Sequence, residues 1–311
     1  MPYIAGIGAA NVDIHSRGIG GPFRLRDSNL GEVHLTPGGV VRNMCEVLSR
    51  LDMPCELCTA VAQDPFGDML LKNFSETNMG TKALEIFPKE EAATATYLDV
   101  LDETGDMIAS VCDQRIFDNL NERYITKHLK ILNGAEIVLL DANVSISGLN
   151  ALAEKCERPI FMDPIATDLS ERIRPYLRMC DTIKPNLQEL EALSAMRIVT
   201  QKDLDEACSL VLDNGVKHLW ISMGERGLYY ADASGVRLRG RSHTFDNCVN
   251  VTGAGDATMA TIAWCTAKGL DLETTMQYAL AAGLVAISSD YTVNPDMSVT
   301  LLEFYRKKYV L

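Results

Sequence analysis

Short apolar runs alternate with segments of helical apolar period along most of the chain. Residues 3–10 predict a first strand, and the apolar stripe within 39–51 predicts an amphipathic helix followed by a strand at 56–62. Later strand–helix pairs are expected to begin near Glu136, Pro159, Thr182 and His218, with further helices over 252–267, 272–288 and 299–307. This alternation predicts an α/β protein with a mostly parallel central sheet.

Two stretches do not follow this alternation. Residues 14–36 are rich in glycine and polar side chains, and residues 93–113 read as a hairpin that turns through Glu103-Thr-Gly-Asp106. If the two stretches pair, they form a small β-lid over the carboxyl ends of the parallel strands, where open α/β sheets bind ligands. Because no repeat or low-complexity linker is visible, we expect one domain over 1–311, with the lid at about 14–36 and 93–113.

Composition and charge narrow the range of partners. The 311 residues are 47% apolar and 23% charged, as in ordinary globular proteins. A net charge of −13, from 29 Lys and Arg against 42 Asp and Glu, repels the phosphate backbone of nucleic acids. A nucleic-acid polymer is therefore not expected as a partner, whereas a small nucleotide held by backbone N–H groups is compatible with this charge.

The cysteines and the absence of long apolar runs suggest a compartment. Nine cysteines occur without regular pairing, which favours a reducing environment over a disulfide framework. The one Cys-x-x-Cys motif, Cys55 to Cys58, lies in a segment that reads as a strand and not as a redox helix. Residues 1–30 lack a secretory pattern, and no run of about 18 apolar residues occurs. We expect a cytoplasmic protein without a membrane partner.

The segment Asn250-Val-Thr-Gly-Ala-Gly-Asp256 carries the strongest chemical signal. Small residues directly before a helix let backbone N–H groups face an anion, and the helix dipole adds positive potential there. Phosphate would repel an aspartate at this place, so the presence of Asp256 needs a reason, and service as a general base for an attacking hydroxyl is the mechanistic one. Capping of the helix by Thr252 or Asp256 is the simpler alternative.

This segment resembles the second signature of the ribokinase (PfkB-type carbohydrate kinase) family, with Asn250 where most members have aspartate. The first signature is matched by Pro37-Gly-Gly-Val-Val-Arg-Asn43 and the later Ala60-Val-Ala-Gln-Asp-Pro-Phe-Gly67. Gly6-Ile-Gly-Ala-Ala-Asn-Val-Asp13 and Lys184-Pro-Asn-Leu-Gln-Glu189 are similar to further family elements, so the resemblance covers nearly the whole chain. It implies a three-layer α/β/α fold, an ATP-dependent kinase and Mg²⁺, with a monovalent cation such as K⁺ known in the family.

The pseudouridine kinase branch of the family is more similar still. The matching segments are 27–31, 36–40, 250–256 and 294–298, and this branch shares the asparagine at 250. The resemblance implies transfer of phosphate from ATP to the 5′-hydroxyl of pseudouridine. Another sugar or nucleoside kinase, acting on ribose, adenosine or a further nucleoside, is the alternative, and a non-catalytic binding protein on the same fold is a more distant one. The pair Gly6 and Gly8 lacks the third glycine of a dinucleotide-binding fingerprint.

Candidate residues for the sugar and the reacting group follow from these motifs. Asp256 is the expected base, with Gly253, Ala254 and Gly255 as the anion-binding turn. Asn11 and Asp13 lie two apart at the expected end of the first strand, so both side chains project to one face and can take two ribose hydroxyls. The remaining expected substrate contacts are Gly38, Gly39 and Asn43 for the sugar and, by position in the lid, Ser28, Asn29, Thr36, Thr94 and Thr96 for the base.

Candidate residues for ATP and magnesium lie later in the chain. Glu189 is expected to hold Mg²⁺ through water and Asn186 a phosphate oxygen, although the same pair also fits a capping box. Asp141 and Asp163 are candidates for a supporting role near the metal. ATP is expected along Ser222, Gly224, Gly227 and Thr252, with adenine near Ala282, where small residues equally fit close helix packing. An exposed lid sheet has free edges, which suggests a homodimer that pairs lid to lid.

Overall fold

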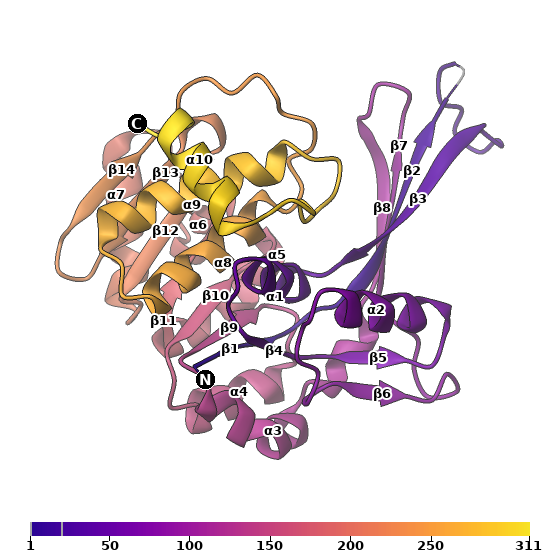
Figure 1. Ribbon diagram of the computed structural model, residues 1–311, viewed down its shortest axis with the longest axis horizontal. Helices are drawn as coiled ribbons and strands as arrows, with labels where there is room; N and C mark the ends of the chain where they lie inside the picture. Colours follow the sequence, from indigo (N-terminus) through magenta and orange to yellow (C-terminus); the bar gives the residue numbers. More distant parts are fainter. Residues whose placement is uncertain (1, 20) are drawn as a thin grey trace.

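The computed structural model describes residues 2–19 and 21–311; Met1, and Gly20 within the predicted 14–36 lid segment, lie outside the described residues. An eight-stranded sheet forms the body, in the order β14-β13-β12-β11-β10-β9-β1-β4 (Figure 1). Its strands are β1 (Ile4–Ile7), β4 (Cys55–Cys58), β9 (Ile137–Asp141), β10 (Ile160–Asp163), β11 (Cys180–Ile183), β12 (His218–Ser222), β13 (Leu228–Asp232) and β14 (Arg237–Gly240). Within this sheet, neighbouring strands pair in parallel along the part β12-β11-β10-β9-β1-β4, as predicted.

One part of the predicted alternation is wrong. After β12 the chain makes a short 3₁₀ turn, Gly224–Arg226, and returns as β13 and β14, which pair antiparallel at the sheet edge. The sequence predicted a helix after this strand. Residues 228–231 are a short apolar run that is buried on both faces of the sheet, which a strand accommodates, and a two-strand return needs only a few residues to turn.

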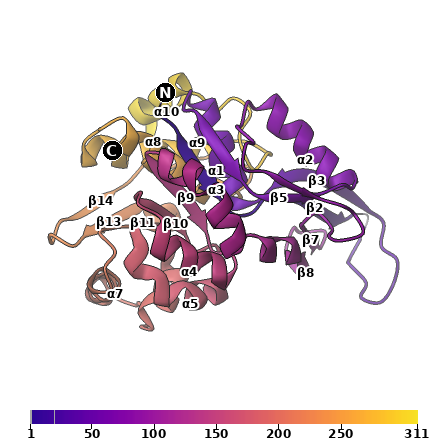
Figure 2. The same ribbon diagram turned by 90° about the horizontal axis from the view of Figure 1, so that it is seen from below.

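Helices cover both faces of the large sheet. They are α1 (Val40–Arg50), α2 (Pro65–Glu76), α3 (Glu122–Gly134), α4 (Ile146–Lys155), α5 (Thr167–Ile173), α6 (Leu187–Ser194), α7 (Gln201–Asp213), α8 (Ala254–Ala267), α9 (Leu272–Ile287) and α10 (Val299–Tyr309). Along β9, Val138 and Leu140 join one apolar cluster while Ile137 and Leu139 join the other. Figure 2 shows α8, α9 and α10 on one side of the sheet and α4, α5 and α7 on the other. The result is a three-layer α/β/α body.

A second sheet of four strands, β3-β2-β7-β8, projects from the body (Figure 1). Its strands are β2 (Asn11–Gly18), β3 (Gly31–Gly38), β7 (Thr96–Leu101) and β8 (Met107–Asp113), so the two irregular stretches of the sequence do pair with each other. The prediction that Asn11 and Asp13 end the first strand is wrong. β1 ends at Ile7, and both residues lie at the start of β2, which begins at Asn11. A third, two-stranded sheet joins β5 (Ala60–Ala62) to β6 (Glu85–Phe87).

The two faces of the four-stranded sheet differ in chemistry. Asp13 is paired with Thr36 and Tyr97, and His15 with His34 and Asp99, so these side chains share what we call the polar face. The opposite, apolar face carries exposed side chains on its outer strands, namely Val33, Leu35 and Val111. Because Asn11 and Asp13 belong to the polar face, that face is the one turned toward the predicted sugar site.

Two other expectations are tested by the same coordinates. All nine cysteine thiols are free, and Cys55 and Cys58 lie at the ends of β4, as the strand interpretation of that motif predicted. Within residues 2–19 and 21–311, none of the helices combines the length and apolar character that a bilayer crossing requires.

Candidate active site

Asp256 lies in the first turn of α8, next to the body end of the four-stranded sheet. The helix begins after Gly253, whose backbone is left-handed (φ 80°), and a Cβ there would sit 1.9 Å from the carbonyl oxygen of Thr292. Only glycine fits this turn, because a side chain meets both the unfavourable φ and a fixed backbone atom. The glycine therefore fixes where the helix begins and where the Asp256 carboxylate stands.

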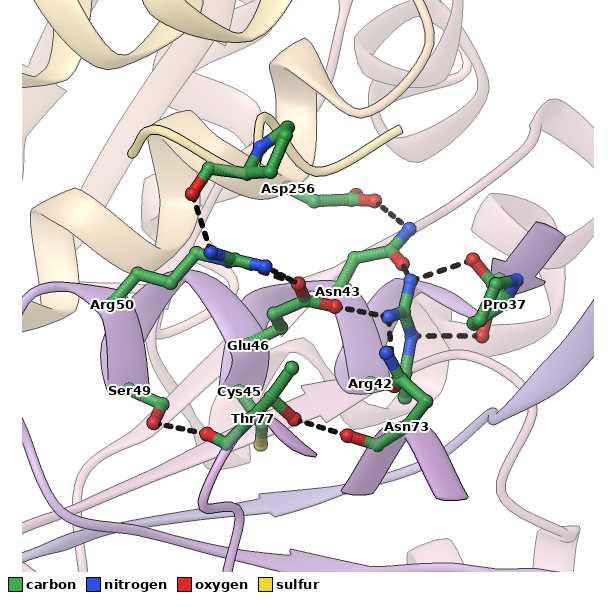
Figure 3. Close-up of polar contacts among 12 residues, drawn as sticks. Pro37, Arg42, Asn43, Cys45, Glu46, Ser49, Arg50, Asn73, Thr77 and Asp256 are labelled. Atoms are coloured by element: carbon green, nitrogen blue, oxygen red, sulfur yellow. Dashed lines mark hydrogen bonds and ion pairs between the residues drawn. The ribbon is translucent and has the colours of Figure 1, made fainter. Parts of the chain in front are cut away.

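Asn43 meets Asp256 from the opposite helix, α1. Its amide Nδ2 donates to Asp256 Oδ2 at 2.6 Å, as Figure 3 shows. The other carboxylate oxygen, Oδ1, has no hydrogen-bond partner among the residues that the structure describes. Sequence reasoning assigned Asn43 to the substrate; the structure shows that its amide also holds the expected base. One oxygen of Asp256 is thus anchored while the other is available to a hydroxyl.

The surroundings of Asp256 raise its pKa to about 7. Burial is the main cause and the nearby carboxylate of Asp163 adds to it, while Asn43, Lys184 and Arg42 act in the opposite direction. A carboxylate with a pKa near neutral accepts a proton more readily than an ordinary aspartate and is still ionised in a useful fraction of molecules. This environment suits a general base.

Lys184, at the end of β11, is a buried cation that sequence reasoning quoted without a role. Its Nζ lies 3.1 Å from Asp163 Oδ2, and a Cβ on Gly255 would stand 3.3 Å from the same nitrogen. Burial lowers the pKa of Lys184, but Asp163, Glu189 and Asp256 more than reverse this, so the pKa is raised. The sequence contained a signal for this lysine, because Lys184 belongs to the Lys-Pro-Asn element next to Glu189, the expected metal ligand.

Asn186 and Glu189 form the capping box that the sequence left open. Asn186 Oδ1 accepts from the Glu189 N–H at 2.9 Å, and Glu189 Oε2 accepts from the Asn186 N–H at 2.8 Å. Burial, followed by the charge of Asp163, raises the pKa of Glu189 to about 7. Two carboxylates that repel each other at a buried place are an arrangement that a divalent cation relieves, so the cap and the metal role are compatible.

Asp141 has a structural task that explains its burial. Its Oδ2 accepts from the Ala9 N–H at 2.8 Å and from the Val41 N–H at 3.4 Å, and its Oδ1 from the Asn143 N–H at 2.9 Å. Helix α1 has no side-chain cap of its own, because Gly39 precedes it. Asp141 therefore serves as the anion at the start of α1, and burial raises its pKa to about 6 despite these donors.

The structure places the residues predicted to contact the sugar close to one another. Asn11 Nδ2 donates to Asp13 Oδ1 at 2.5 Å, and a Cβ on Gly38 would collide with the Asp13 carboxylate at 2.2 Å. Gly39 is left-handed (φ 98°), and its chain passes close to the carbonyl oxygen of Ala9. The two glycines thus permit the carboxylate and the start of α1 to approach each other.

The lid residues predicted to contact the nucleobase lie in different parts of the structure. Thr36 lies on the polar face, with a buried hydroxyl that has no partner among the described residues. Ser28 and Asn29 lie beyond Gly18, at the far end of the β2–β3 hairpin, five strand residues or about 17 Å from Asp13. Thr94 is buried and its Oγ1 accepts from the Ala62 N–H at 2.9 Å.

Thr96 is a correction to the sequence prediction. It pairs with Val12 and not with Asp13, so its side chain belongs to the apolar face. The prediction assumed no register and therefore could not tell the two faces apart. His15 and Asp99 are among the residues that share the face of Asp13, and their Nδ1 and Oδ2 atoms lie 2.7 Å apart.

The expected nucleotide residues are only partly assembled. Asn186 and Ser222 form a parallel bridge, and Gly224 (φ 59°) and Gly227 (φ 85°) shape the turn that follows. Thr252 is exposed beside the start of α8. Ala282 is fully buried in the core between helices, so its prediction as an adenine contact is wrong. The small residues of α9 serve close packing against α8, the alternative that the sequence left open.

A cavity of about 860 Å³ opens beside the loop that follows α9. It is lined by residues of the 288–298 loop and of α10, among them Tyr291, Asn294 and Phe304, together with Val249. None of Asn11, Asp13, Asn43 and Asp256 lines it, so it lies apart from the site built around the expected base.

Comparisons with known proteins show which family and fold the chain is similar to. The model of the protein family described as "pfkB family carbohydrate kinase" matches residues 1–298 of this chain. A pseudouridine kinase from Escherichia coli is 32% identical over 298 residues, covering 96% of this chain and 94% of its own. A guanosine-inosine kinase from Exiguobacterium acetylicum is 26% identical over 308 residues, covering 96% and 98%. An Escherichia coli protein described as a ribokinase II, solved with ATP and Mg²⁺, superposes with a TM-score of 0.83 at 20% identity, covering 99% and 100%.

Proposed function

Because the chain belongs to the PfkB family of carbohydrate kinases and has the ribokinase-like fold, we propose that it transfers the γ-phosphate of ATP to the 5′-hydroxyl of pseudouridine. The Escherichia coli pseudouridine kinase, similar over almost its whole length, supports this choice of substrate. The observation that carries the kinase assignment is Asp256: one oxygen is bound to Asn43, the other is available, and its pKa is about 7.

In this proposal the residues of the chain divide the work as follows. Asn11 and Asp13 bind two ribose hydroxyls, which directs the 5′-hydroxyl toward Asp256. The free Oδ1 of Asp256 takes the hydroxyl proton as that oxygen attacks the γ-phosphorus in line. Backbone N–H groups at the start of α8, around Gly253 to Gly255, face the negative charge that spreads over the transferring group. Closure of the four-stranded sheet as a lid excludes water as a competing acceptor.

ATP and Mg²⁺ are the proposed cofactors, as in the Escherichia coli ribokinase II structure. Glu189 would hold the cation through water, with Asp163 in a supporting role behind it, because Mg²⁺ keeps several waters and needs only one or two protein carboxylates. When bound, the cation neutralises phosphate charge during transfer. Asn186, Ser222, Gly224, Gly227 and Thr252 are the residues proposed for ATP. A dependence on K⁺ is a further expectation from the resemblance to the family.

The polar face of the four-stranded sheet offers a way to recognise the base. A carboxylate only accepts hydrogen bonds, so the His15 Nδ1 beside Asp99 carries a proton, and in the tautomer with that single proton Nε2 is an acceptor. Pseudouridine differs from uridine in its free N1–H, which such an acceptor can bind. His15 lies one strand repeat beyond Asp13, about 7 Å along β2, where a base attached to the bound ribose extends.

A substrate panel tests the assignment. Purified protein is incubated with ATP, Mg²⁺ and, in turn, pseudouridine, uridine, adenosine, inosine, guanosine and ribose, and ADP release is measured. We expect the highest kcat/KM with pseudouridine. Equal values for uridine would remove the substrate assignment and leave the kinase assignment standing. Preference for inosine or guanosine would favour the alternative that the Exiguobacterium enzyme suggests, and binding without ADP release would favour a sensor.

The assembly and location are proposals of the same kind. The exposed apolar face of the four-stranded sheet, with Val33, Leu35 and Val111, supports a homodimer that pairs lid to lid. Nine free thiols support a reducing compartment such as the cytoplasm. Light scattering on a Val33→Lys variant tests the dimer, which this charge should dissociate, whereas a wild-type monomer would contradict it.

A further inference from the structure

Arg42 is an arginine with every donor engaged, one position before the asparagine that holds Asp256. Its side chain is 2% exposed. Nε donates to Gly38 O at 3.3 Å, one terminal nitrogen donates to Glu46 and Asn73, and the other donates to Pro37 O and Asn43 Oδ1 (Figure 3). The five N–H groups of the guanidinium thus meet five acceptors, which fixes the plane of the group.

The bond from Arg42 to Asn43 decides how the Asn43 amide is turned. Because Arg42 donates to Oδ1, the NH₂ end of the amide must point the other way, toward Asp256 Oδ2. The flipped amide would set its NH₂ against the guanidinium and its oxygen against the Asp256 carboxylate, an arrangement with two repulsive contacts. The orientation of this amide therefore depends on Arg42.

The same guanidinium reaches the root of the four-stranded sheet. Pro37 and Gly38 are the last residues of β3, and Arg42 binds both of their carbonyl oxygens. Gly38 in turn pairs with Asn11 and lies against the Asp13 carboxylate. The Arg42 side chain therefore connects the end of β3, beside the proposed sugar site, to the Asn43 amide that contacts Asp256.

We propose that Arg42 is a positioning residue for Asp256: it locks the Asn43 amide with its NH₂ toward the carboxylate and ties that amide to the end of β3. Arg42 faces no substrate itself, since all five donors are used within the protein. The proposal rests on the proposed function for its readout, because it concerns how well the base performs.

Glu46 keeps a cationic partner when Arg42 is changed, which makes the test practicable. Its Oε1 accepts from Arg50 at 2.6 and 2.9 Å, so this buried carboxylate retains a cation after the loss of Arg42. Arg50 also donates to Pro295 O at 2.6 Å but does not touch Asn43. Arg50→Met is therefore a matched control: it removes an arginine from the same carboxylate and leaves the Asn43 amide alone.

The test is a double-mutant cycle with the best substrate of the panel. We expect Arg42→Met to lower kcat/KM about ten- to hundredfold, the effect of losing one hydrogen bond to a charged group. Asn43→Ala should lower it at least as much, and the Arg42→Met/Asn43→Ala double variant should be within threefold of Asn43→Ala alone, since Arg42 acts through Asn43. Arg50→Met should stay within twofold of the wild type.

Other outcomes overturn the proposal. Multiplicative losses in the double variant would show that Arg42 acts independently of Asn43, and full activity of Arg42→Lys would show that charge alone is needed. If no panel substrate is turned over, the proposed function fails, and the positioning role is then tested by a crystal structure of Arg42→Met. We expect the 2.6 Å contact between Asn43 Nδ2 and Asp256 Oδ2 to be lost there; its retention would refute the role.

Discussion

Replacement of Asp256 by asparagine should abolish catalysis while making the protein more stable. The amide has nearly the shape of the carboxylate, and its oxygen can still accept from Asn43 Nδ2. It cannot take a proton from a hydroxyl at neutral pH. Because the asparagine keeps the contacts and loses the charge, the two effects have one cause, and they should appear together.

The size of each effect follows from the environment of the carboxylate. Loss of a general base costs about 10²- to 10⁴-fold in turnover. In the folded protein burial, followed by Asp163, raises the pKa of Asp256 from 3.8 to about 7. This means that folding disfavours the ionised form by on the order of 4 kcal/mol. An acid whose pKa is raised by folding costs stability as pH rises from about 4 to 7, and the variant does not carry that cost.

Turnover is measured by ADP release, nucleoside affinity by calorimetry with a non-hydrolysable ATP analogue, and stability by thermal unfolding between pH 4 and 8. We expect kcat to fall about a thousandfold, affinity to change only a few-fold, and Tm to rise by several degrees at pH 8. The gain in Tm should shrink toward pH 4, where the wild-type carboxyl is protonated as well. Turnover within tenfold of the wild type would remove Asp256 from the chemistry, and a lower Tm at pH 8 would refute the burial argument.

Three further predictions concern neighbouring features. The pKa of about 7 for Asp256 implies that kcat/KM falls about thirtyfold between the plateau and pH 5.5, and a profile flat to pH 5 would contradict it. Gly253→Ala should lower Tm far more than Gly269→Ala. Both glycines have a positive φ, but an added Cβ collides with the carbonyl oxygen of Thr292 only at Gly253 and meets open space at Gly269. Equal losses of Tm would contradict the steric argument. His15→Ala should reduce the preference for pseudouridine over uridine about tenfold or more, and an unchanged ratio would exclude His15 as the contact of the nucleobase.

Local patterns in the sequence were enough for most of the body. Helix α1 was expected over 39–51 and runs from Val40 to Arg50, and α8 and α9 begin within two residues of their predicted starts. Apolar stripes and glycine-rich turns are local properties, so one sequence shows them. The antiparallel return through β13 and β14 was missed because a short buried apolar run, such as 228–231, does not distinguish a strand from a helix.

Features that depend on register or on distant partners could not be predicted. Thr96 was assigned to the wrong face because one residue of register reverses every side chain of a strand. Ala282 was placed at a ligand and lies in the core, since small residues have the same signature in both settings. The contact of Asn43 with Asp256 joins residues 213 positions apart, and the five acceptors of Arg42 come from three segments; no spacing in the sequence reports either.

Asp256 lies late in the sequence, so it is among the last parts of the chain to be synthesised. Asn11, Asp13 and Asn43 are made first, but the helix that carries Asp256 begins at residue 254 and packs against α1 across the middle of the fold. A nascent chain halted before that helix contains the residues proposed to bind the sugar and lacks the residue proposed to accept the proton. It also leaves the apolar side of α1, including Val41 and Met44, without its cover, so an interrupted product is inert as a catalyst and a candidate for chaperone capture.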